Sequence, residues 1–65
     1  MDEKKAKALA NLLGGETWDS GGDIYLVLVK RKDGKVVAFS DETVCLYADE
    51  DALESGEPEA NIDLL

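Results

Sequence analysis

The sequence predicts a small α+β domain with the element order α-β-β-β-α-β. Its small, mostly antiparallel sheet is a three-stranded meander plus a short C-terminal strand, with an N-terminal helix on one face and a short second helix. Three observations predict it. Apolar residues recur at helical spacing in residues 3–13, Asp33-Gly34 separates two apolar runs as hairpin turns do, and β-forming side chains dominate residues 43–48. We expect residues 1–65 to form a single small domain.

The first predicted helix spans residues 3–13. Alanine, leucine and lysine favour helix, Asp2 can cap its start, and Gly14-Gly15 supplies a stop. The lysines crowd the N-terminal half, where the helix dipole disfavours positive charge, so we expect packing to hold this helix. The apolar face that packs consists of Ala6, Leu9, Ala10 and Leu13.

The central hairpin joins the apolar runs 24–29 and 36–39. A two-residue turn would pair Val29 with Ala38, whereas a three-residue turn with a glycine bulge would shift every pair by one; the sequence leaves both open. Before the hairpin, residues 14–22 form a glycine-bounded loop whose ETWD segment can be briefly extended.

The C-terminal third is predicted as strand, helix and strand. Residues 43–48 read as the third strand, although a helix capped by Ser40 is an alternative. Residues 49–55 form a short helix capped by Asp49. The final ANIDLL fits a short last strand.

The charge is divided unevenly along the chain. Residues 1–38 carry seven bases and six acids, whereas residues 39–65 carry nine acids and no base, for a net charge of −8. Such a half repels nucleic acid and anionic lipid, and no stretch approaches the ~20 apolar residues of a membrane span. We expect no direct nucleic-acid binding and no membrane association. The missing secretory pattern and the single Cys45 predict a cytoplasmic protein.

The residues that carry most enzyme chemistry are scarce. With no histidine and one cysteine, Cys45 has neither a disulfide partner nor an activating base, and a structural zinc site is excluded. The acids of WDSGGD lack calcium-loop spacing, and the pair Asp41-Glu42 is expected to be solvated. We therefore expect a non-enzymatic protein with no catalytic residue, metal site or cofactor.

The strand at residues 24–29 is apolar on both faces. The N-terminal helix can cover one face only, and the short second helix can shield part of the other but not all of it. An uncovered apolar face usually marks an interface. The sequence therefore predicts a protein-interaction module, most simply a homodimer through sheet faces or edge strands, with an unidentified protein partner as the rival. The two sets of side chains are Ile24, Leu26 and Leu28 on one face and Tyr25, Val27 and Val29 on the other.

Candidate interaction residues come from apolar, basic and acidic segments. The tryptophan either covers the core or anchors an interface, and the basic hairpin tip of one copy can meet the acidic half of another. An alternative function is nucleic-acid mimicry, in which clustered acids imitate phosphates and inhibit or regulate a DNA- or RNA-binding protein. The candidates are Trp18, Tyr25, Val27, Val29, Lys30, Arg31, Lys32, Asp49, Glu50, Asp51 and Glu54.

Overall fold

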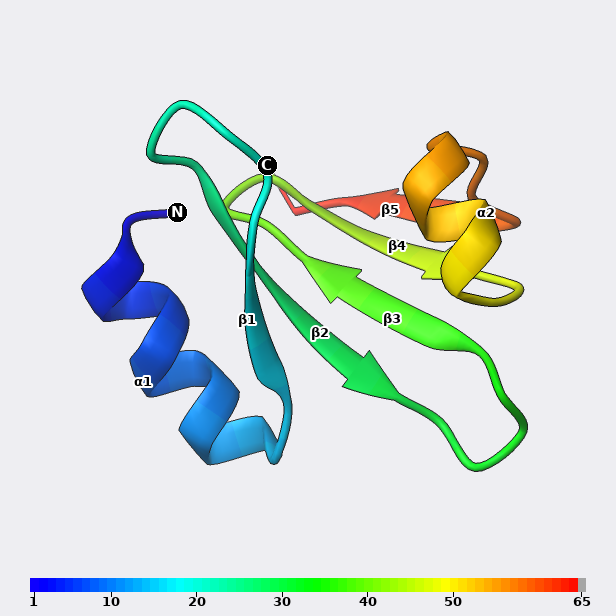
Figure 1. The fold of residues 1–65 in the computed structure, drawn as a ribbon, viewed down its shortest axis with the longest axis horizontal. Helices are drawn as coiled ribbons and strands as arrows, with labels where there is room; N and C mark the ends of the chain where they lie inside the picture. Colours follow the sequence, from blue (N-terminus) through cyan, green and yellow to red (C-terminus); the bar gives the residue numbers. More distant parts are fainter. Residues whose placement is uncertain (65) are drawn as a thin grey trace.

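Five strands form one antiparallel sheet, with the strands in sequence order from edge to edge. The computed structural model describes residues 1–64. Figure 1 shows α1 beside β1 and β2 at one end of the sheet and α2 beside β4 and β5 at the other. The predicted α+β class is confirmed. The sheet has one strand, β1, in addition to the predicted meander and C-terminal strand. The elements are α1 (Glu3–Leu13), β1 (Glu16–Asp19), β2 (Tyr25–Lys30), β3 (Val36–Phe39), β4 (Thr43–Tyr47), α2 (Glu50–Ser55) and β5 (Ala60–Asp63).

Both helices begin and end where the sequence places their caps. The Asp2 side chain accepts a hydrogen bond from the Lys5 backbone N–H at 2.8 Å, and that of Asp49 accepts one from the Ala52 N–H at 2.8 Å. Each helix stops at a left-handed glycine, which L side chains rarely replace; the φ of Gly14 is 68°.

The central hairpin uses the three-residue turn. Leu28 lies opposite Ala38, and the Arg31 backbone N–H donates to the Lys35 carbonyl oxygen at 2.8 Å. Gly34 has a φ of 89°, as the glycine bulge of such a turn requires. The pairing is therefore the one-residue shift, and the strand prediction for residues 43–48 is confirmed by β4.

Strand β1 is the ETWD segment that the sequence places in a loop. Trp18 lies opposite Leu26 of β2. The chain can enter this strand because Gly15 has no side chain: a Cβ there would collide with the Leu28 carbonyl oxygen and lie 3.0 Å from a Val29 methyl carbon. A glycine next to a helix stop thus allows a close approach of two backbones.

The core has two small parts, one on each face of the sheet. Alternate side chains of β2 point to opposite faces, so Val27 packs under α1 while Leu28 packs toward α2. The α1 cluster is Ala6, Ala10 and Val27, and the α2 cluster is Leu28, Val36, Ala38 and Leu53.

Candidate functional site

The predicted apolar candidates of β2 lie on the face that α1 covers. Val27 has no exposed surface, because Ala6 and Ala10 pack directly on it. Tyr25 and Val29 are half-buried. Val27 is therefore withdrawn from the candidate surface, since a partner cannot reach it.

The same face is also apolar over the other three strands, where α1 covers it only at its margin. Side chains of directly opposed residues share a face, and Val29 lies opposite Val37, which lies opposite Leu46. α1 packs against β1 and β2, and in residues 1–64 no other helix covers this side of β3–β5. Phe39 packs at the inner margin of this surface against the α1 cluster. We call the surface the open face; its residues are Val37, Phe39, Val44, Leu46, Ala60 and Ile62.

Exposure along the open face increases toward the edge of the sheet. Val37 and Phe39 of β3 and both β4 residues are half-buried, whereas Ile62 of the edge strand is 65% exposed. In a well-covered sheet these positions would be buried. The open face thus offers a continuous apolar surface across three strands.

One side of α1 borders the open face. Lys5, Leu9 and Leu12 are spaced i, i+4 and i+7, so they share a side of the helix. The Lys5 ammonium binds a carboxylate oxygen of Asp41, in the β3–β4 turn, at 3.0 Å, so this side faces β3 and β4. Leu12 continues it with 82% of its surface exposed.

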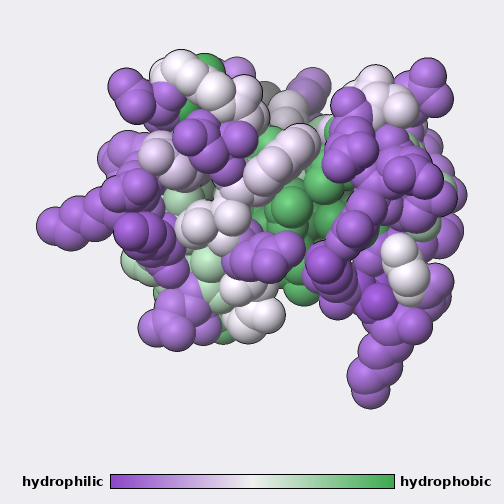
Figure 2. Space-filling view, in the orientation of Figure 1, coloured by the Kyte–Doolittle hydropathy of each residue, from purple (hydrophilic) through white to green (hydrophobic). Residues whose placement is uncertain are grey.

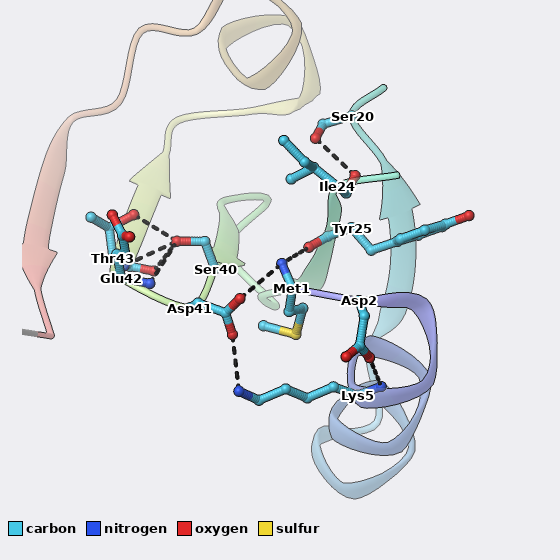
Figure 3. A network of polar contacts seen from close by, with 10 residues as sticks. All are labelled: Met1, Asp2, Lys5, Ser20, Ile24, Tyr25, Ser40, Asp41, Glu42 and Thr43. Carbon is cyan, nitrogen blue, oxygen red and sulfur yellow. Dashed lines mark hydrogen bonds and ion pairs between the residues drawn. The ribbon is translucent and has the colours of Figure 1, made fainter. Parts of the chain in front are cut away.

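The border nearest the chain start is polar (Figure 3). The Met1 amine donates to the Tyr25 carbonyl oxygen at 3.0 Å and lies 3.2 Å from Asp41 Oδ2. The hydrogen bonds from Lys5 and from this amine hold the pKa of Asp41 below its ordinary value. These contacts fix the start of α1 to the β3–β4 turn. They thereby set the position of α1 relative to the open face.

The other face of the sheet carries a small cavity beside α2. Its volume is about 170 Å³, and Trp18, Leu28 and Leu53 contribute to its lining. Figure 2 shows apolar surface gathered at the middle of one side of the molecule, with hydrophilic side chains to either side. Trp18 is half-buried and packs against the α2 cluster, so it covers the end of that core.

The predicted basic and acidic candidates meet at this cavity. Lys30 Nζ lies 2.6 Å from Glu50 and 3.9 Å from Glu16, and the hydrogen bond to Glu50 raises the pKa of Lys30. Glu54 lies on the same rim. An adjoining cavity of about 410 Å³ is lined by Lys30, Arg31, Gly34, Val36, Asp49, Glu50 and Asp51.

Most basic side chains form ion pairs with acids of the same chain. Lys30 binds Glu50, and Lys35 binds Glu59 at 2.9 Å. The sequence predicts contact between the basic hairpin of one copy and the acidic half of another. In the structure the hairpin instead forms these ion pairs with acids of its own chain. Among residues 1–64, Lys4 and Lys32 are the basic side chains without an ion pair; the paired ones are Lys5, Lys7, Lys30, Arg31 and Lys35.

Most acids of the C-terminal half keep their charge uncompensated. Of its nine acids, only Asp41, Glu50 and Glu59 have an ion pair within the described residues. The β4–β5 half of the molecule is therefore strongly negative, most densely around α2, with Glu42 in the turn that borders the open face. The acids without an ion pair there are Glu42, Asp49, Asp51, Glu54, Glu57 and Asp63.

The titratable side chains of β4, Cys45 and Tyr47, share one face of the sheet. Cys45 is half-buried; burial and then the Cys45 sulfur raise the pKa of Tyr47. Over residues 1–64, no three His, Cys, Asp or Glu side chains are grouped to hold a metal ion. The helices in that range are too short or too polar to cross a membrane.

Sequence reasoning missed the open face. Alternation in residues 36–39 and 43–48 indicates which side chains share a face. It does not indicate that α1 packs over β1 and β2, which is what leaves this face open. Comparison of the chain with protein-family models, with curated proteins and with solved structures finds no match.

Proposed function

We propose that the protein is a non-enzymatic protein-interaction module that binds a partner through the open face. One observation carries this proposal: α1 packs over β1 and β2 and reaches β3 only at Phe39, so most of the apolar side of β3–β5 has no helix over it. Covering one large aliphatic side chain fully is worth about 1.5–3 kcal/mol. Most of the open-face side chains are already partly buried, so a partner gains most at Ile62, which is 65% exposed.

The charge of the chain favours a different protein over a second copy. A homodimer, as the sequence predicts, would place two molecules of net charge −8 in contact. Like charges at a shared rim oppose association, and the basic hairpin is already bound by its own acids. A partner with basic residues around an apolar centre meets no such repulsion.

Site-specific photocrosslinking in the cells that make the protein tests the proposal. Ile62 and Asn61 are neighbours on β5, both exposed, and their side chains point to opposite faces of the sheet. A photoreactive residue at position 62 should yield a discrete adduct, whereas the same residue at position 61 should not. This matched pair separates binding at the open face from general contact with β5.

Two results would count against the proposal. Equal adducts from positions 61 and 62 would remove the open face as the binding surface, and so would the absence of any adduct at position 62. An adduct of twice the 7.0 kDa chain mass, confirmed by light scattering, would identify the second copy as the occupant.

The alternative of nucleic-acid mimicry has no specific observation in its favour. It needs acids held along one rigid face, but Asp49 caps α2 and Glu50 is bound by Lys30. Asp51 and Glu54 lie on a helix of only six residues, and Glu42 and Asp63 lie away from it. Salt-sensitive adducts of a nuclease or polymerase to position 54, on α2, would favour it.

A further inference from the structure

We propose, on the basis of the function above, that the occupant of the open face is one amphipathic α-helix with basic flanks, lying beside α1. Three features lead to this partner: the width of the uncovered surface, its length, and the sign of the charge around it.

The width fits one helix. Neighbouring strands lie about 4.8 Å apart, so the line between β3 and β4 is about 10 Å from the line between β1 and β2, over which α1 packs. Packed helices have axes about 8–10 Å apart and diameters of about 10 Å. A second helix over β3 and β4 would therefore contact the exposed side of α1, where Leu12 lies.

The length fits a helix of three turns. β4 has five residues, which span about 16 Å at ~3.3 Å each. About 11 helical residues cover that distance at 1.5 Å each. Such a segment presents three or four apolar side chains on one stripe, enough to cover Val44, Leu46 and Ile62.

The surrounding charge selects basic flanks. Glu42 has no ion pair in the described part of the chain and lies in the β3–β4 turn that borders the open face, whereas the side chain of Asp63 points to the other face. No lysine or arginine follows Lys35. Lysine or arginine beside the apolar stripe would be attracted by this half of the molecule, and acidic flanks would be repelled.

Three synthetic peptides of about 11–14 residues test the inference against the full chain. The first has a leucine stripe flanked by lysines, the second has the same stripe flanked by glutamates, and the third has the composition of the first with its leucines scattered around the helix. Methyl NMR titration reads out both affinity and location. We expect the lysine-flanked peptide to shift the methyl signals of Val37, Val44 and Leu46, the glutamate-flanked peptide to bind at least about tenfold more weakly, and the scattered peptide to leave these signals unchanged.

Two variants with the same charge change locate the binding. Ile62→Lys replaces an open-face side chain and should weaken the lysine-flanked peptide about tenfold or more. Asn61→Lys adds the same charge on the opposite face and should weaken it by no more than about fivefold. Both positions are exposed, and circular dichroism verifies that both variants fold.

Several outcomes would overturn the helix inference. These are equal binding of all three peptides, tighter binding of the glutamate-flanked peptide, shifts confined to α2, or equal effects of the two variants. If crosslinks nevertheless form at position 62 and not at 61, the proposed function stands and only the helix is wrong. If neither experiment selects position 62, both proposals fail.

Discussion

Leu53 is the side chain by which α2 holds to the sheet. It is 8% exposed and packs on Leu28, Val36 and Ala38. Leu53→Ala removes three carbon atoms, each worth about 0.8 kcal/mol of burial, and leaves a cavity that the edge of a helix can partly close. We expect the free energy of unfolding to fall by about 2–3 kcal/mol.

The loss should appear first in α2. A helix of six residues is far shorter than the roughly 12 residues that isolated helices need, so without its anchor it should unfold while the sheet remains. Hydrogen exchange should then accelerate at the backbone N–H groups of Ala52 and Gly56, which bond to Asp49 and Leu53.

The matched control is Leu12→Ala, the same chemical change in the other helix. Leu12 is 82% exposed, so urea unfolding should differ from the wild type by no more than about 0.5 kcal/mol. The small gain in helix propensity from leucine to alanine is shared by both variants. Equal costs for the two substitutions would refute the reasoning, because burial alone distinguishes them.

Two further predictions concern backbone contact and charge. Gly15→Ala should lower the free energy of unfolding by about 1–3 kcal/mol in urea titrations, because its Cβ meets the Leu28 carbonyl oxygen; an unchanged midpoint would contradict the close approach. Asp41→Asn should destabilise most at neutral pH. The pKa of Asp41 is depressed below 3.8 by Lys5 and the Met1 amine, so its stabilisation is complete above that pH and is lost as the pH falls through the folded-state value. A difference between wild type and variant that stays constant down to about pH 2 would count against this ion pair.

The local signals in the sequence predict the elements well. Capping residues place α1 and α2, as Asp2 and Asp49 confirm, and alternation places β4. Strand β1 escaped because four residues between glycine pairs give no clear period; pairing with β2 makes them a strand. The hairpin register depended on the backbone of Gly34, since both turn lengths use glycine at that place.

The candidate surface was less predictable for a different reason. Alternation separates Tyr25, Val27 and Val29 from their neighbours, but it does not say which set α1 covers. That depends on how the chain crosses from Gly15 into β1. The prediction that one face of β2 is uncovered is wrong, because Val27 and Leu28, on opposite faces, are both buried; the apolar surface without a helix lies over β3–β5 instead.

The central claim is that the chain leaves the open face uncovered, and methyl accessibility to a soluble paramagnetic agent tests it most directly. The measurement uses a sample whose light scattering gives the 7.0 kDa monomer. The account predicts strong relaxation of the Ile62 and Val44 methyl signals, while Val27, which has no exposed surface, remains protected. Protection of Ile62 and Val44 equal to that of Val27 would mean that the chain covers this face itself, and would contradict the account.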